Sequence, residues 1–437
     1  MKQLPKTEMQ RRRRTLMRMM EKNSIAIIPS APERTRNRDV TYPYRQDSDF
    51  LYLTNFSEPE SIAVFVPGRK QGEYILFCRE RDEEKETWHG RRAGQEGAVH
   101  DYHADDAFPI GDIDEILPGL LEGRERVYYT MGKDTHFDTH LMEWINQLRQ
   151  SVRSGASVPH EFIDLEYLVH ELRLFKSRSE MRLMREAARI TREAHIRAMS
   201  TCEPGMYEFE IEAEILHAFH RANTEPAYPS ILGSGENGCI LHYTENDAQL
   251  KDGDLLLIDA GCEYGGYASD VTRTFPVNGH FSEPQKQLYE LVLAAQAAAI
   301  KRAKPGNHWN DPHQAAISVL TKGLIKLGLL KGSAVKLIKD EAYRKFYMHR
   351  TGHWLGLDVH DVGDYKFDDQ WRVLEPGMVL TIEPGLYIPA GVKGVKKQWW
   401  NIGIRIEDDV LITKDGNEVL TAEIPKTIND IEALMAA

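Results

Sequence analysis

The sequence predicts an α/β protein of two domains, and three observations lead to this fold class. The chain of 437 residues suits two or three domains at roughly 150 residues each. Over about the first 170 residues, short apolar runs alternate with charged helical stretches, as in an α/β domain. Beyond them, two similar segments of ten residues indicate a second domain that is internally duplicated.

Composition and charge restrict the classes of function. With 41% hydrophobic and 28% charged residues, the chain resembles an ordinary globular protein. Its formal net charge of −12 argues against a nucleic-acid-binding surface, which needs clustered Lys and Arg. We expect no membrane span and no secretory signal, because no apolar stretch is long enough for either. The cysteines lack Cys-x-x-Cys spacing and predict a reducing cytoplasm; they are Cys78, Cys202, Cys239 and Cys262.

The first domain is predicted to span residues 1–175. It begins with a helix in which Met9, Leu16 and Met20 recur at helical spacing. The basic run at 11–14 (RRRR) is therefore expected to form a solvated helix face rather than a nucleic-acid-binding arm. Strands are expected at 25–28, 62–66, 74–77 and 127–129.

The second domain is predicted to span residues 176–437. It opens with a long amphipathic helix at 180–199, for which Ser177 or Ser179 is a suitable N-cap. Residues 250–259 (LKDGDLLLID) align without gaps on residues 374–383 (LEPGMVLTIE). Each copy has a turn with glycine, a short apolar strand and a final carboxylate. We interpret the match as an internal duplication, although turn-then-strand segments are common.

Four acids are predicted to meet on the strands of this domain. A hairpin turn centred on Tyr264 and Gly265 would make Asp259 and Asp270 direct cross-strand partners. Another turn register would need a bulge to keep the two acids on one face. Downstream, Glu383 and Glu407 end or follow two further strands, with Arg405 on the same face as Glu407. Buried acids need basic partners or metal ions, and one arginine is too little.

Histidines near these acids point to metal chemistry. His349, His353 and His360 fall within a short segment, and His242 is a further candidate. An oxygen-rich site with one imidazole suits Mn²⁺, or Co²⁺ and Zn²⁺ according to availability. Bridging carboxylates would hold two ions about 3.5–4 Å apart around a shared nucleophilic water. The residues alone therefore predict a dinuclear metal hydrolase.

Other motifs give no competing function. The segment 233–238 (GSGENG) matches the glycine spacing of a dinucleotide-binding loop. A strand-like stretch follows it, so no helix N-terminus is available for a phosphate, and we expect a loop without cofactor binding. The sequence contains no phosphate-binding P-loop, no His-Glu-x-x-His pair and no Gly-x-Ser-x-Gly elbow.

Five segments resemble, in order, the metal-ligand motifs of the Xaa-Pro aminopeptidase (aminopeptidase P) family of pita-bread metallopeptidases. They are IDAG (258–261), SDVTRTF (269–275), GHWLGL (352–357), IEPGLY (382–387) and RIED (405–408). Residues 42–53 (YPYRQDSDFLYL) also resemble the N-terminal domain of that family. The resemblance implies a duplicated, strongly curved catalytic domain from about residue 178, preceded by an α/β domain that narrows access to the site.

The resemblance also implies roles for single residues. Asp270 and Glu407 would bridge two ions, Asp259 would bind one, and His353 with Glu383 would complete the other. A metal-bridging hydroxide would attack the peptide carbonyl, and Glu383 would carry the proton to the leaving nitrogen. The remaining residues would surround the substrate: His360 and His242 as donors to the carbonyl oxygen, His349 and Tyr387 as a wall against the proline ring, and Arg405 as an orienter of the acids.

The substrate expected from this resemblance is a peptide with proline at the second position. An Xaa-Pro bond has no N–H, so the ring must be held by shape, and we expect the trans isomer. A homodimer or homotetramer is implied, in which Trp88 either reaches a neighbour's site or simply packs. The alternatives are prolidase, methionine aminopeptidase and a pita-bread binding module. Residues 42–53 favour the aminopeptidase over prolidase, and the five retained ligands argue against the module.

Overall fold

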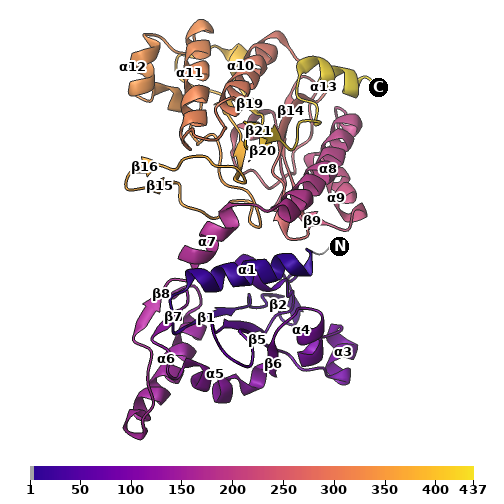
Figure 1. Ribbon diagram of the computed structural model, residues 1–437. Coiled ribbons are helices and arrows are strands. Elements are labelled where there is room, and N and C mark those ends of the chain that lie inside the picture. The colour runs from indigo at the N-terminus through magenta and orange to yellow at the C-terminus, as the bar shows by residue number, and fades with distance from the viewer. Residues whose placement is uncertain (1–3) are drawn as a thin grey trace. The chain divides into compact units, whose positions relative to one another are not determined.

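Two units with separate hydrophobic cores make up the chain, which a computed structural model describes over residues 4–437 (Figure 1). One unit ends at Arg173, and the other runs from Leu174 to Ala437. Among the described residues, no helix is both long enough and apolar enough to cross a bilayer.

A mixed six-stranded sheet forms the centre of the N-terminal unit. Its strand order is β6-β5-β4-β1-β7-β8, with β1 antiparallel to β4 and parallel to β7. All four strands expected from the sequence are confirmed. The sheet consists of β1 (Ser24–Pro29), β4 (Ile62–Phe65), β5 (Tyr74–Cys78), β6 (Asp106–Pro109), β7 (Arg126–Tyr128) and β8 (Glu161–Ile163). A separate exposed hairpin is formed by β2 (Thr35–Asn37) and β3 (Val40–Thr41).

Helices cover this sheet. Apolar side chains of α5 and α6 pack with those of the strands in one core cluster, as expected when a sheet must bury an apolar face. The helices of the unit are α1 (Lys6–Met19), α2 (Ser48–Thr54), α3 (Glu83–His89), α4 (Gly94–His100), α5 (Ile113–Leu121), α6 (Thr135–Gln150) and α7 (Glu166–Leu174), with 3₁₀ turns η1 (Ile110–Asp112) and η2 (Val152–Ser154).

The predicted basic helix forms as α1, but the prediction of a fully solvated arginine face is wrong. Arg12 and Arg13 are only 2% and 4% exposed. The Arg12 guanidinium lies 4.1 Å from the ring centroid of Tyr52, and that of Arg13 lies 4.3 Å from that of Tyr74. Each also donates a hydrogen bond to a carbonyl in the last turn of α2. Cation–π contacts and hydrogen bonds to carbonyl groups at the helix end therefore offset the cost of burying these charges.

Short, mostly antiparallel strand groups form the centre of the second unit. In Figure 1, β14, β19, β20 and β21 lie between α8 and α9 on one side and α10 and α11 on the other, whereas β15 and β16 lie at the left-hand edge. The groups are β10-β11-β14, β13-β12-β9, β17-β20-β21, β18-β19 and β15-β16. The strands are β9 (Glu225–Pro226), β10 (Ile231–Ser234), β11 (Leu255–Asp259), β12 (Cys262–Tyr264), β13 (Tyr267–Ala268), β14 (Thr272–Pro276), β15 (Lys366–Phe367), β16 (Gln370–Trp371), β17 (Val379–Ile382), β18 (Gly385–Ile388), β19 (Ile402–Arg405), β20 (Asp408–Ile412) and β21 (Asn417–Val419).

The long helix predicted after the boundary is confirmed as α8. Ser177 is its N-cap and forms a reciprocal capping box with Glu180, which satisfies two free N–H groups. The helices of the unit are α8 (Arg178–Thr201), α9 (Glu208–Arg221), α10 (Glu283–Ile300), α11 (Asp311–Lys326), α12 (Ala334–Lys339) and α13 (Ile428–Met435), with 3₁₀ turns η3 (Gly235–Cys239), η4 (Ala342–Lys345) and η5 (Lys397–Trp399).

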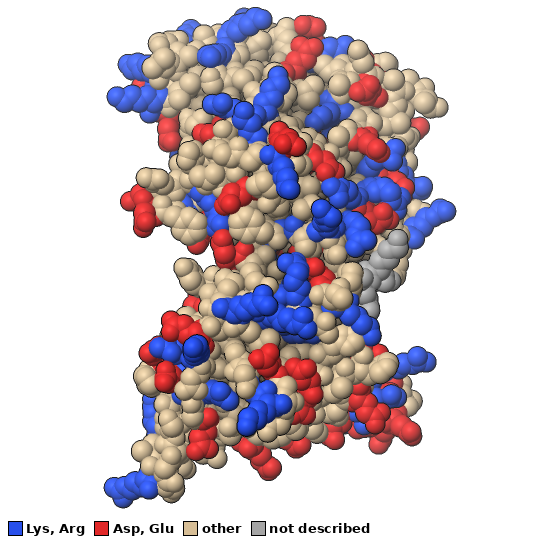
Figure 2. Space-filling model, in the orientation of Figure 1, with Lys and Arg blue, Asp and Glu red and all other residues tan. Residues whose placement is uncertain are grey.

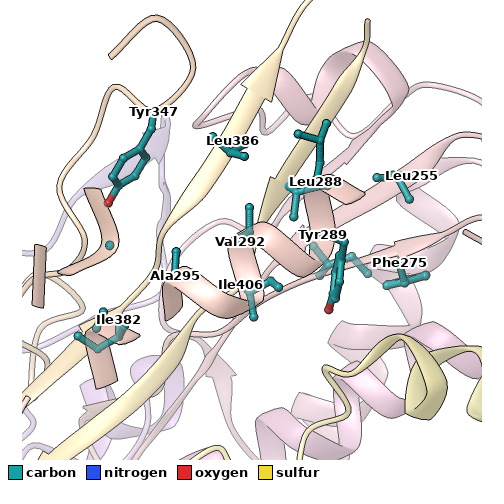
Figure 3. Packing of buried hydrophobic residues seen from close by; sticks show 14 of the residues in the cluster. Leu255, Phe275, Leu288, Tyr289, Val292, Ala295, Tyr347, Ile382, Leu386 and Ile406 are labelled. Atoms are coloured by element: carbon teal, nitrogen blue, oxygen red, sulfur yellow. The ribbon is translucent and has the colours of Figure 1, made fainter. Parts of the chain in front are cut away.

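The two aligned segments adopt the same local structure. Gly253 and Gly377 both have positive φ, at +86° and +100°, a conformation that favours glycine. Each glycine precedes a buried strand, β11 or β17, which pairs antiparallel with a later strand, β14 or β20. Figure 3 shows α10 between these halves, with Leu288, Val292 and Ala295 among side chains of both.

The predicted hairpin register is wrong: the partner of each residue is shifted by two positions along the second strand. The turn is centred on Gly265 and Gly266, which both have positive φ, as a type I′ turn requires. Asp259 therefore faces Thr272 rather than Asp270. Because the shift is even, both acids stay on one face without a bulge.

The glycine-rich segment 233–238 does not form the expected loop; it forms the end of β10 and the start of η3. There the backbone passes very close to β19. A Cβ atom on Gly403 would lie 1.9 Å from the carbonyl oxygen of Gly238. Only glycine allows this approach, which joins the first half of the duplication to the second.

Replacing Gly403 with alanine is expected to lower the free energy of unfolding by about 1–3 kcal/mol, because the added methyl group overpacks a closed contact. Urea unfolding measures the effect. Gly416→Ala is the matched control, since a Cβ there would meet nothing within 4 Å. Equal stabilities of the two variants would contradict the close approach of η3 and β19.

Candidate active site

A cavity of about 510 Å³ opens among the strands of the second unit. It contains all five residues that the sequence analysis assigned to metal ions. The strands bring together positions from both halves of the duplication. The lining includes Asp259, Asp270, His353, Glu383 and Glu407, together with His242, His349, His360 and Arg405.

Strand ends position the four acids. Asp259 is the last residue of β11, and Glu383 directly follows β17, the equivalent strand of the second copy. Asp270 directly precedes the Val271 that leads into β14, and Glu407 lies between β19 and β20. His353 comes from a loop, but its backbone exchanges hydrogen bonds with Thr381 of β17. The five side chains are therefore held by β structure.

Negative charge exceeds positive charge in this cavity. Arg405 donates to Asp259 at 2.6 Å, and His353 Nε2 lies 3.2 Å from Asp270. Burial and neighbouring acids raise the pKa of Asp259, Glu383 and Glu407, in the case of Glu383 to about 7. Burial also acts on Asp270, but the hydrogen bond from His353 leaves its pKa lowered. These two cations do not neutralise the four acids, of which three are buried and Glu383 is partly buried.

His353 is oriented as a metal ligand. Its Nδ1 lies 2.9 Å from the carbonyl oxygen of Trp354, so Nδ1 donates and Nε2 faces the acids. Burial opposes a charge on this ring, but the hydrogen bond to Asp270 and that acid's charge raise the pKa of His353 to about 9. A divalent cation can replace the proton on Nε2, because the second ring nitrogen already has its partner. The donor set thus fits a cationic metal centre.

A second group of possible metal ligands lies in the N-terminal unit, but its acids are paired with basic side chains. Ligand atoms of Asp49, Glu166 and His170 lie within 4.8 Å of one another, and the two acids line a cavity of about 590 Å³. Lys133 lies 3.0 Å from Glu166 and 3.6 Å from Asp49, and Arg173 lies 2.7 Å from Asp49. These cations already neutralise the acids, so this group needs no metal ion.

Two residues of the site were missed by the sequence analysis. The Tyr228 hydroxyl lies 2.7 Å from Asp259 and 2.6 Å from Asp270. Thr272 donates to Glu407 at 2.6 Å and accepts from Arg405 at 3.0 Å. Strand alternation signals Thr272, since it follows Asp270 by two positions. No sequence pattern indicates Tyr228, which comes from an irregular segment.

The other predicted site residues occupy different positions. His242 and His360 are exposed lining residues of the cavity, and burial together with the nearby His353 lowers the pKa of His360. His349 is partly buried and accepts a hydrogen bond from Tyr387 at 2.8 Å. Trp88 belongs to the N-terminal unit, where its side chain is 78% exposed.

The structure corrects the prediction that Tyr387 forms a wall against substrate. Tyr387 is fully buried and is not a lining residue of the cavity. Its hydroxyl accepts from Arg405 at 3.0 Å and donates to His349, whose pKa is lowered by burial to about 3 and which therefore stays neutral. Because β18 turns Tyr387 inward, the residue supports His349 and Arg405 from behind.

Comparisons with known proteins show the family of this chain. Residues 182–414 match metallopeptidase family M24, and residues 9–128 match the N-terminal domain of aminopeptidase P. The chain belongs to metallopeptidase family M24. A relative, the Xaa-Pro aminopeptidase of Escherichia coli (strain K12), is 47% identical over 439 residues, covering 100% of this chain and 99% of that protein.

Solved structures of aminopeptidases resemble the whole chain. The aminopeptidase PepP of Pseudomonas aeruginosa has 58% identity and a TM-score of 0.99, covering 100% of this chain and 99% of that one. E. coli aminopeptidase P, solved in a zinc-substituted form with product, has 47% identity and a TM-score of 0.97 over 99% of both chains. The predicted pita-bread fold and the predicted likeness to the Xaa-Pro aminopeptidase family are confirmed.

Proposed function

We propose that this M24 enzyme hydrolyses the bond between an N-terminal residue and a following proline. One observation carries the proposal: Asp259, Asp270, His353, Glu383 and Glu407 line a single cavity with an excess of negative charge. The similarity to Xaa-Pro aminopeptidases over the full chain supports the same substrate class.

Five residues would hold the two divalent ions. Asp270 and Glu407 would serve both ions, Asp259 would belong to one of them, and His353 with Glu383 would belong to the other. Arg405 and Thr272 fix the carboxylate orientations through hydrogen bonds to Asp259 and Glu407. When bound, the ions polarise the carbonyl and activate a water molecule as the nucleophile. Mn²⁺ suits this oxygen-rich donor set best, with Co²⁺ or Zn²⁺ as alternatives.

Residues around the ligands handle the substrate. His242 and His360 donate N–H groups to the carbonyl oxygen as its charge develops. Glu383, with 18% of its side chain exposed, accepts the proton of the nucleophile and passes it to the leaving nitrogen. His349 faces the cavity and, backed by Tyr387, limits the space for the proline ring. The ring must be gripped by shape, since an Xaa-Pro bond offers no N–H, and the site takes the trans isomer.

Assembly and location complete the proposal. The N-terminal domain, residues 1–175, narrows access to the site, and the protein acts as a homodimer or homotetramer, a state that light scattering measures. The highly exposed Trp88 supports such an interface. Four free cysteines, three of them buried, support a reducing cytoplasm. In Figure 2, Lys and Arg are interspersed with Asp and Glu on the face shown, which supports peptides rather than nucleic acid as partners.

Peptide hydrolysis tests the proposal. The Mn²⁺-loaded protein is expected to cleave Xaa-Pro-Yaa tripeptides after the first residue and to leave Xaa-Ala-Yaa controls intact. Amino-acid analysis of the products measures both reactions. Turnover of Xaa-Pro dipeptides alone would identify a prolidase, and release of N-terminal methionine without a proline requirement would identify a methionine aminopeptidase. A folded protein that binds no metal and cleaves nothing would favour a binding module.

A further inference from the structure

A buried ion pair lies behind the loop that carries His353 and His360. Lys176 Nζ is 2.8 Å from Asp361 Oδ2, and each side chain is only 1% exposed. Asp361 directly follows His360 in the sequence. Lys176 lies two residues after Leu174, where the catalytic unit begins. The pair thus joins the start of this unit to the active-site loop.

The loop is folded closely around the pair. The backbone N–H of Asp361 donates to the carbonyl of Trp354 at 2.9 Å. At Gly356, a Cβ atom would lie 2.1 Å from Asp361 Oδ2 and 2.9 Å from Lys176 Cε. The pair therefore occupies the space that a side chain would need, and its position sets the path of the backbone from Trp354 to Asp361.

His360 depends on that backbone path. Within residues 4–437 its exposed ring has no hydrogen-bond partner, and its one ring contact is with His353, at 4.4 Å between centroids. The backbone of Lys176 is itself fixed, because its N–H donates a hydrogen bond to the carbonyl of Gly377, in the turn before β17. The strand β17 leads to Glu383. Lys176 thus connects the loop that carries His360 to the strand that positions a predicted metal ligand.

We propose that Lys176 and Asp361 are positioning residues that aim the His360 ring at the substrate carbonyl. This inference rests on the proposed function. Stability alone does not account for the pair, because the cost of desolvating two charges offsets much of their attraction. The pair instead restricts the loop to one geometry, and His360 takes its orientation from the loop.

The test removes the pair without leaving a buried charge. In the Lys176→Met/Asp361→Asn double variant, kcat and kcat/KM for an Xaa-Pro-Yaa peptide are expected to fall together by about 10–100-fold. Metal content and the unfolding midpoint are expected to match the wild type. A crystal structure of the variant is expected to show the His360 ring displaced. The surface pair Arg185–Glu418 in the same unit supplies the control, Arg185→Met/Glu418→Gln, which should leave kcat unchanged.

A double-mutant cycle separates positioning from a structural role. Added to His360→Ala, the double variant should cause little further loss, because the group that it positions is already gone. A wild-type kcat in the folded double variant, or an undiminished loss on top of His360→Ala, would overturn the inference. If the double variant does not fold, Asp361→Asn alone enters the same cycle. An inactive wild-type enzyme would instead contradict the proposed function.

Discussion

Glu407→Gln is expected to lower kcat/KM for Xaa-Pro-Yaa peptides by on the order of 10³-fold or more. The substitution preserves the shape of the side chain and its contact with Thr272, but it removes the charge of a predicted bridging ligand. Metal ions supply several kcal/mol of transition-state stabilisation, and each 1.36 kcal/mol is a factor of ten in rate. Steady-state kinetics measure the loss of kcat/KM, and the metal content of the purified protein measures the accompanying loss of bound metal.

Glu166→Gln is the matched control for this substitution. Glu166 belongs to the ligand-like group in the N-terminal unit, where Lys133 already pairs with it. We expect an unchanged metal content and a kcat/KM within a few-fold of wild type. A Glu407→Gln variant that kept two ions and full activity would remove Glu407 from the metal centre.

Metal removal is expected to make stability strongly dependent on pH. Burial and the neighbouring acids raise the pKa of Glu383 to about 7, above its ordinary value of about 4.3. A raised pKa stabilises the folded state below the ordinary value, and this stability is lost as the pH rises through 7. Asp259 and Glu407 shift in the same direction, and His353, with a pKa of about 9, extends the loss to higher pH.

Thermal unfolding at pH 5, 7 and 9 measures this effect. The melting temperature of the metal-free protein should fall across the series, and saturating Mn²⁺ should remove most of the fall at pH 7 and above. Asp270 does not reverse the trend, because its lowered pKa changes stability only under acidic conditions. Glu383→Gln should flatten the profile of the metal-free protein. Parallel profiles with and without Mn²⁺ would show that no ion binds among these acids.

The sequence predicted those site residues that belong to short, recognisable segments of the chain. The strand-then-carboxylate pattern at Asp259 and Glu383 predicted two halves that meet at one site, and the structure places both residues in the same cavity. Strand alternation also placed Arg405 with the acids. The hairpin register was harder to predict, because adjacent glycines allow the turn centre to move by one residue.

Long-range partners account for most of what the sequence did not indicate. Arg12 is buried by Tyr52, which is 40 residues away, and Lys176 pairs with Asp361 across 185 residues. The sequence around Tyr387 does not show whether its aromatic ring lines the cavity or lies behind the cavity wall. Only the three-dimensional arrangement of β18 and β19 decides that it contacts His349 and Arg405 instead of open space.

Anomalous diffraction from a crystal soaked in Mn²⁺ tests the metal centre most directly. The account predicts two peaks about 3.5–4 Å apart, both within coordination distance of Asp270 and Glu407, one also near Asp259 and the other near His353 and Glu383. Peaks only at Asp49, Glu166 and His170, or none among the five predicted ligands, would contradict it.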